Sequence, residues 1–412
     1  MIEEPGMSDE SYLVLRVKGG PRRGVESLGT GLEPFRTKAE SDAPEEVEFR
    51  VDVETVGASG HAELRRDPDA VVVARPMPVA LIEPVPMSTP DAAPEPVNGA
   101  TWGVFVTGAL QSPYTGAGVT VAVLDTGIDA SHEAFQGIDL VQRDFTGEGN
   151  GDKDGHGTHV AGTIFGQTTQ GVRFGVAPGV RRALIGKVLG ALRTATTVEL
   201  AGAVQWAADG GASVINMSLG FDFPGMVNGL MKQGLPANFA TSRALAQYRD
   251  NIRFFDALLQ LLRARVTQSS GALLVSAAGN ESRRQLRPDF TIDVAPPAAA
   301  DGVVAVAALG TAGAPHDNLT VAPFSNVRAA VAAPGAQIHS AQAGGGYTLK
   351  SGTSMASPHV TGVAALWAER QLQLNGRVNV PSLDAQLRGH ARRLPNASYL
   401  DVGDGLIAAP AD

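Results

Sequence analysis

The sequence predicts an α/β fold in which a parallel sheet, covered by helices on both faces, follows a small α+β unit. Short apolar runs separated by stretches able to form helices recur in the second part of the chain, at 119–124, 183–189, 212–215, 272–276 and 303–308. Runs that are apolar on both faces are typical of buried parallel strands joined by helical crossovers. In such sheets ligands bind at the carboxyl ends of the strands, so the side chains that follow these runs matter most for function.

The first part of the chain has a different pattern. Residues 12–17 and 47–53 are β-rich, and the second run alternates apolar with polar residues as a half-buried antiparallel strand does. Residues 61–66 can form a short helix, and 70–74 a further strand. We therefore expect a separate α+β domain over 1–86.

A proline-rich, small and acidic segment follows at 87–100. This composition is typical of an exposed, extended linker, so we place the domain boundary there and expect a second domain at 101–412.

Composition excludes several classes of protein. Of the 412 residues, 43% are hydrophobic and 18% charged, as in an ordinary globular protein, and the net charge of −9 argues against nucleic-acid binding. No apolar run is long enough to span a bilayer. The acidic N-terminus lacks the apolar region of a secretory signal, and the chain has no cysteine, so we expect a cytoplasmic location.

Asp125 stands directly after the apolar run 121–124. A carboxylate there is costly to keep ionised unless it is hydrogen-bonded, although Asp is also a common turn residue. A candidate partner is His156, which has a glycine on each side. The spacing of His156 and His159 does not match a His-Glu-x-x-His metal motif, so we interpret His159 as a core residue.

Two further polar residues come at similar positions. Ser354 opens an apolar helical pattern, where it either caps the helix or uses the N-terminal amides to stabilise a developing negative charge. Asn280 follows the run at 272–275 and is either a turn residue or a donor to an oxyanion.

Nucleophilic acyl transfer accounts for all four side chains together. A serine hydroxyl needs a neutral imidazole to take its proton, the imidazole needs a carboxylate to fix its tautomer, and the oxyanion needs donors. The chain order Asp, His, Ser is that of the subtilisin type of site.

Three motifs carry a resemblance to the subtilisin-like serine peptidases. They are Asp125-Thr126-Gly127-Ile128, His156-Gly157-Thr158-His159-Val160-Ala161-Gly162 and Gly352-Thr353-Ser354-Met355-Ala356-Ser357-Pro358. The resemblance covers roughly residue 101 to the C-terminus. It implies that Asp125 orients His156, that His156 is the general base and acid, that Ser354 is the nucleophile and that Asn280 donates to the oxyanion.

The resemblance also implies how a substrate lies. Ser218, Leu219 and Gly220 would pair as a strand edge with an extended polypeptide, and Gly220 would let the peptide come close. Ala278 and Gly279, with residues 295–298, would wall a first specificity pocket with room for a large apolar side chain. The alternative is that Asp293 lies on the pocket floor and favours Lys or Arg.

Residues 1–86 resemble the inhibitory propeptide of these peptidases, a ferredoxin-like α+β domain. This resemblance implies an intramolecular inhibitor, and the exposed linker predicts self-cleavage within 87–100.

Other features depart from the family pattern. Ala134 stands where several relatives have a calcium ligand, so the usual tight calcium site is doubtful and we expect no cofactor. The acidic loop of Asp144, Glu148, Asp152 and Asp154 could bind a cation, or is a solvated charge cluster.

The chain also carries a helical insertion at about 221–268. Its apolar stripe either packs in the core or forms a rim or lid over the substrate; the stripe is Phe239, Leu245, Ile252, Phe255, Leu258, Leu259 and Leu262.

We therefore expect a self-processing serine endopeptidase that acts on polypeptides. The alternatives are a peptide-maturation protease or transpeptidase with the same triad, and a catalytically silent peptide-binding module.

Overall fold

The structure is a computed structural model that describes residues 10–18, 48–57, 60–86, 96–168, 171–264, 271–311 and 318–411. An eight-stranded sheet lies at its centre, in the order β13-β12-β11-β9-β5-β7-β6, and β14 pairs with β12. Its strands are β5 (Thr120–Asp125), β6 (Asp139–Asp144), β7 (Arg182–Lys187), β9 (Val214–Met217), β11 (Leu273–Ala277), β12 (Val303–Thr311), β13 (Leu319–Val321) and β14 (Val331–Pro334). Every pairing is parallel except that of β12 with β13. The predicted α/β class with a parallel sheet is confirmed.

The sequence pattern missed strands at the margins of this sheet. Strand β6 has the sequence DLVQRD and none of its residues is fully buried, because it lies at the sheet edge. An edge strand does not need two apolar faces, so the pattern of apolar runs could not detect it.

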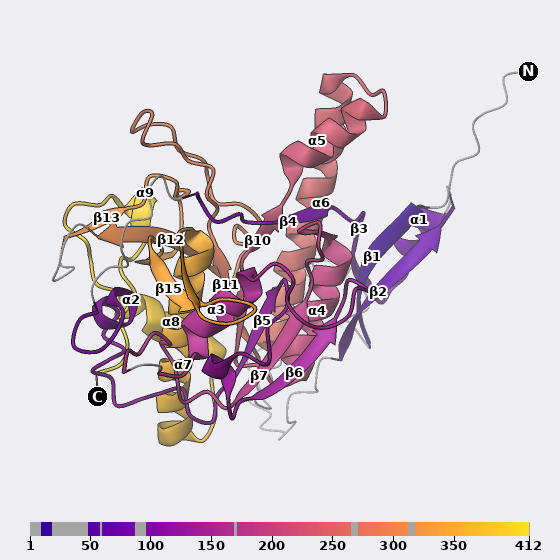
Figure 1. Ribbon diagram of the computed structural model, residues 1–412. Coiled ribbons are helices and arrows are strands. Elements are labelled where there is room, and N and C mark those ends of the chain that lie inside the picture. Colours follow the sequence, from indigo (N-terminus) through magenta and orange to yellow (C-terminus); the bar gives the residue numbers. More distant parts are fainter. Residues whose placement is uncertain are drawn as a thin grey trace, which may run out of the picture.

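Helices cover both faces of the sheet (Figure 1). They include α3 (His156–Phe165), α4 (Thr197–Asp209), α6 (Ala237–Ala264) and α7 (Thr353–Asn375). Alternate residues of β5 enter different cores: Val121 and Val123 belong to the cluster with residues of α3 and α7, whereas Ala122 and Leu124 belong to the cluster with residues of α4 and α6. This alternation is the period of two expected of a strand buried on both faces.

The N-terminal elements form a small sheet in the order β2-β1-β3. They are β1 (Glu10–Val17), β2 (Phe49–Val56), α1 (Gly60–Leu64) and β3 (Ala70–Ala74). Leu13 and Leu15 of β1 pack in the same core cluster as α4 and α6. Gln205 Oε1 of α4 accepts from Val51 N at 3.0 Å, and Asn251 Nδ2 of α6 donates to Arg75 O at 2.8 Å. The small sheet therefore lies against these two helices. Its strands and its short helix fall where the sequence pattern predicted them.

The strand β4 (Pro78–Leu81) continues from this sheet into the larger part of the molecule. It lies between β10 (Leu219–Phe221) and β8 (Thr194–Thr196) and is antiparallel to both. Figure 1 labels β4 next to β10. The predicted linker falls largely outside the described residues, because only 96–100 of it are described.

The predicted insertion is helical and contains α5 (Phe223–Lys232) and the whole of α6. Its apolar stripe is divided. Phe255, Leu258 and Leu262 are buried, whereas Phe239 and Leu245 are 63% and 53% exposed. The C-terminal half of α6 is thus core, and α5 projects from the molecule (Figure 1).

None of the helices in the described part of the chain has the length and apolar character needed to cross a membrane. The location of the protein stays a prediction.

Candidate active site

Asp125 and His156 form a buried hydrogen bond. Asp125 is the last residue of β5 and His156 the first of α3, and their side chains are fully buried. His156 Nδ1 lies 2.8 Å from Asp125 Oδ1, which also accepts from Thr126 N at 2.8 Å. An ionised carboxylate only accepts, so Nδ1 carries the hydrogen and the lone pair of a neutral ring is on Nε2. The ring is therefore oriented as a base.

Glycine allows these two residues to meet. A Cβ on Gly157 would lie 2.2 Å from Gly127 O and 3.2 Å from Asp125 Cβ, which is too close for any side chain. Helix α3 can therefore start directly against the turn after β5 only with glycine at 157.

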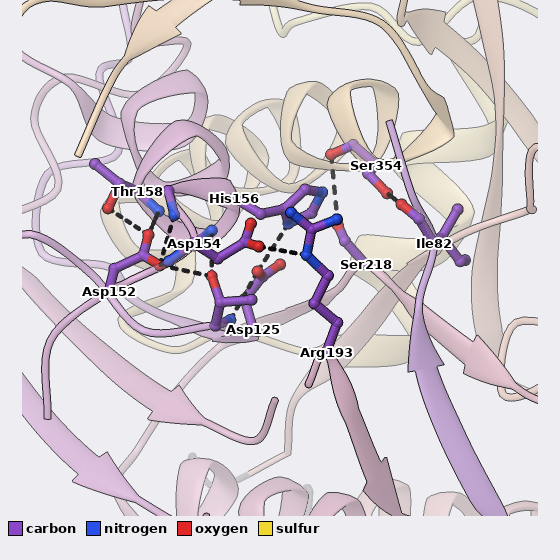
Figure 2. Close-up of polar contacts among 12 residues, drawn as sticks. Ile82, Asp125, Asp152, Asp154, His156, Thr158, Arg193, Ser218 and Ser354 are labelled. Carbon is purple, nitrogen blue, oxygen red and sulfur yellow. Dashed lines mark hydrogen bonds and ion pairs between the residues drawn. The ribbon is translucent and has the colours of Figure 1, made fainter. Parts of the chain in front are cut away.

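Asp152 was missed as a positioning residue. Its Oδ1 accepts from Thr126 Oγ1 and the amides of Asp154 and Gly155, and its Oδ2 accepts from the Thr158 amide and hydroxyl, all within 2.6–3.1 Å. Burial alone would raise its pKa, but these hydrogen bonds outweigh burial and hold the pKa below its usual value of 3.8. Asp152 thus joins the turn after Asp125 to the start of α3 (Figure 2).

His159 is a buried core residue, as predicted. Its Nε2 lies 3.0 Å from the carbonyl oxygen of Ile338, and burial holds its pKa well below the usual value.

Ser354 lies in the first turn of α7, which follows Gly352 as N-cap. First-turn amides have no intrahelical acceptor and are available to an anion. The Ser354 Oγ donates to Ile82 O at 2.8 Å (Figure 2). His156 Nε2 has no hydrogen-bond partner among the described residues. The serine hydroxyl is thus directed at a peptide carbonyl, and the imidazole lone pair is left unpaired.

Asn280 follows β11. It points its amide group into the groove that holds Ile82 and Glu83 beside Ser354. Its Oδ1 accepts from Thr353 N and Thr353 Oγ1, both at 2.8 Å, so its Nδ2 must face the other way. That Nδ2 donates to Glu83 O at 2.8 Å. Asn280 is therefore a hydrogen-bond donor beside Ser354. Its acceptor is the carbonyl oxygen of Glu83, the residue after Ile82.

The predicted strand edge is occupied by the chain's own β4. Leu219 pairs with Leu81 and Gly220 with Ala80, and Ile82 N donates to Ser218 O at 3.3 Å. The Ser218 side chain is buried behind the groove, where its Oγ lies 3.1 Å from Ser357 Oγ. The backbone of 218–220, and not the Ser218 hydroxyl, holds the extended segment.

A cavity of about 650 Å³ lies beside this segment. Gly220, Ala295 and Pro296 line it together with Ile82. A Cβ on Gly220 would lie 3.6 Å from Ile82 Cγ1, an ordinary contact, so close approach of the peptide does not require glycine there. The absent side chain instead leaves space next to Ile82.

The two residues predicted as pocket walls lie behind the cavity. Ala278 and Gly279 do not line it; Asn326 does, and its Nδ2 donates to Ala278 O at 3.2 Å. Asp293 is at the rim, because its side chain is 67% exposed and its Oδ1 lies 3.2 Å from Arg328 Nε. It does not form the pocket floor.

The carboxylates of the acidic loop have protein partners. Asp144 accepts from Thr146 and Gly149, Glu148 accepts from Ala191 N, and Asp154 pairs with Arg193. The described residues contain no group of three or more His, Asp or Glu side chains arranged to hold a metal ion. Calcium binding stays untested.

A buried Asp and His pair, a serine at a helix start and a peptide groove together define a serine-peptidase site of the subtilisin kind. A model of the subtilase family, peptidase family S8, matches residues 116–388. Subtilisin DY of Bacillus licheniformis is 37% identical over 305 residues, which cover 72% of this chain and 92% of that protein. Subtilisin Savinase of Lederbergia lenta is 32% identical over 75% of this chain and 97% of that protein. Alkaline elastase YaB of a Bacillus strain is 34% identical over 78% and 72%. The chain belongs to the subtilase family and is a subtilisin-like serine endopeptidase.

The hydrogen bonds of Asp152 predict a specific defect. Asp152→Asn replaces one acceptor oxygen with an amide that faces N–H and O–H donors, so we expect a loss of about 1–3 kcal/mol in the free energy of unfolding at pH 7. The lowered pKa stabilises the fold above the unfolded value of 3.8, and this contribution is lost as pH falls through the folded value. Denaturant unfolding should therefore show the difference between the two proteins shrinking below about pH 4. A constant difference from pH 3 to pH 7 would refute the role of the ionised carboxylate.

Proposed function

We propose that this endopeptidase hydrolyses peptide bonds through an acyl-enzyme on Ser354 and is made as a self-processing precursor. The observation that carries the proposal is the Ser354 Oγ, 2.8 Å from the carbonyl oxygen of a peptide held in an extended groove. His156 and Asp125 supply the base and its orienting carboxylate.

The reaction needs a rearrangement of these hydrogen bonds. The Ser354 hydroxyl turns from Ile82 O to His156 Nε2, which accepts its proton as Oγ bonds to the Ile82 carbonyl carbon. The oxyanion is stabilised by the Ser354 amide and by Asn280 Nδ2, which moves from Glu83 O to Ile82 O. The carbon–nitrogen bond breaks as His156 passes the proton to the Glu83 nitrogen. Water then hydrolyses the acyl-enzyme by the same route.

The backbone register supports the bond between Ile82 and Glu83 as the one presented to Ser354. Leu81 N donates to Arg193 O at 3.0 Å and Ile82 N to Ser218 O at 3.3 Å, on opposite sides of the segment. Beyond the bond, Val85 N donates to Ser351 O at 2.7 Å. The segment is therefore fixed before and after this peptide bond.

The N-terminal sheet acts as an intramolecular inhibitor in this proposal. The strand β4, which follows this sheet in the chain, fills the groove that a substrate needs, and Leu13 and Leu15 of β1 pack in the cluster formed with α4 and α6. The inhibitor would leave only after cleavage and loss of these contacts.

Self-processing predicts a defined new N-terminus. Wild-type protein should become shorter on incubation and begin with Glu83, whereas Ser354→Ala should stay whole, as intact-mass measurement and N-terminal sequencing can show. Ser131→Ala, which changes an exposed serine, should be processed like wild type.

Two outcomes would count against this account. If wild type and Ser354→Ala both stay whole, self-processing is refuted. A first cut within 87–100 would support the linker prediction and refute the register at Ile82.

The cavity predicts the preferred residue before the cleaved bond. Peptides with Leu or Phe there should have a kcat/KM roughly tenfold or more above the peptide with Arg, because a buried apolar side chain gains about 1.5–3 kcal/mol and Asp293 is exposed and paired. Competition between such peptides in one reaction measures the ratio. A preference for Arg would mean that one of the carboxylates lining the cavity, Asp222, Glu281 or Asp293, acts on the bound side chain.

A further inference from the structure

The side chain of Arg193 reaches past the proposed cleaved bond to the leaving-group side, from a backbone that pairs with a residue before that bond. Its backbone oxygen accepts from Leu81 N at 3.0 Å, which fixes it next to the groove. Its Nη1 is 2.6 Å from Glu83 Oε2, and Glu83 is the residue directly after that bond. The guanidinium thus contacts the side chain at position P1′, the first residue of the leaving fragment.

The guanidinium is held from a second side by Asp154. Arg193 Nε lies 2.5 Å from Asp154 Oδ2, and the Asp154 side chain is 12% exposed. Asp154 is two residues before His156, so Arg193 is tied to the segment that carries the imidazole (Figure 2). An arginine that is already oriented loses less entropy when it binds a carboxylate.

The backbone before Arg193 is also fixed. Arg193 N donates to Gly190 O at 2.8 Å, and its φ of 57° is in the left-handed region that non-glycine residues rarely adopt. Both oxygens of Glu148 accept from Ala191 N, and Glu148 Oε2 lies 3.6 Å from Lys187 Nζ. These contacts fix the backbone from which the Arg193 side chain projects.

A second cation lies nearby. The Lys350 Nζ donates to Gly155 O at 3.0 Å, and burial lowers its pKa. The nearby anions are Asp154, Asp125 and Asp152, and the last two are engaged in hydrogen bonds of their own. The group that faces Glu83 directly is therefore the positive charge of Arg193.

We propose that Arg193 is a specificity-determining residue, which recognises a carboxylate side chain at P1′, so that the preferred substrates are polypeptides with Glu directly after the cleaved bond. This inference rests on the proposed peptidase reaction at Ser354 and names a substrate class for it. The chain's own Glu83 occupies the position that such a substrate residue would take.

The expected effect is moderate, because the Arg193 and Glu83 side chains are 46% and 55% exposed. Exposed ion pairs change an equilibrium by up to about fivefold. We expect kcat/KM to be about two- to fivefold higher for Glu than for Gln at P1′. For Glu against Lys we expect roughly tenfold, since attraction is then replaced by repulsion.

The test uses quenched fluorescent peptides that share the sequence Val-Ala-Leu-Ile before the bond and carry Glu, Gln, Lys or Ala after it. They compete in one reaction with the purified full chain, so each ratio is independent of the fraction of active protein. The variants are Arg193→Gln and, as a matched control, Arg182→Gln. Arg182 is an arginine of similar exposure, paired with Asp139 at the opposite end of the sheet strands.

In wild type and Arg182→Gln, kcat/KM should be highest for the Glu peptide, lower for the Gln peptide and lowest for the Lys peptide. In Arg193→Gln the ratios of kcat/KM should be close to one. A higher salt concentration should reduce the wild-type preference as well. Equal rates for all four peptides in wild type, or an unchanged preference in Arg193→Gln, would overturn the inference while leaving the peptidase reaction intact. If none of the four peptides is cleaved, the peptidase proposal is refuted, and this inference with it.

Discussion

The arrangement of the site depends on the buried hydrogen bond between Asp125 and His156. A fully buried carboxylate is stable only if its charge is compensated, and the imidazole and the Thr126 amide provide that compensation. The bond also fixes two elements, because Asp125 ends the central strand β5 and His156 begins α3. Gly157 makes the close contact possible and Asp152 joins the two backbone segments. Ser354 reaches the same edge from α7, which packs on the same face of the sheet as α3.

The N-terminal sheet is joined to the groove by the strand β4, which follows the sheet and occupies the groove. The strand β4 makes the backbone hydrogen bonds that an extended substrate would make, and the helices α4 and α6 hold the sheet from which it comes. Helix α6 therefore has two roles: its C-terminal half completes the core, and the same helix contacts β3. The backbone of the groove holds the chain's own segment, so in the proposed reaction selection among substrates would depend on the side chains on either side of the cleaved bond.

Much of the fold and site could be predicted from sequence, for physical reasons. The five buried strands are detectable because both of their faces are apolar, and Asp125, His156, Asn280 and Ser354 follow strands or open helices in recognisable motifs. Asp152 and Arg193 could not be identified, because a charged residue in a polar loop has the same sequence pattern whether it is solvated or engaged. The segment facing Ser354 was also unpredictable: pairing of β4 with β10 places Ile82 there, whereas composition alone favoured the proline-rich linker. Local sequence does not determine the register of such a pairing.

The central claim is that the Ser354 hydroxyl becomes a nucleophile activated by His156. The most direct measurement is covalent labelling by a fluorophosphonate during incubation of the full chain, with the modified residue mapped by peptide mass spectrometry. The account predicts a single adduct on Ser354 that accumulates as β4 leaves the groove and is absent from His156→Ala. Absence of an adduct on Ser354 from both the whole and the shortened chain, or equal labelling of His156→Ala, would contradict it.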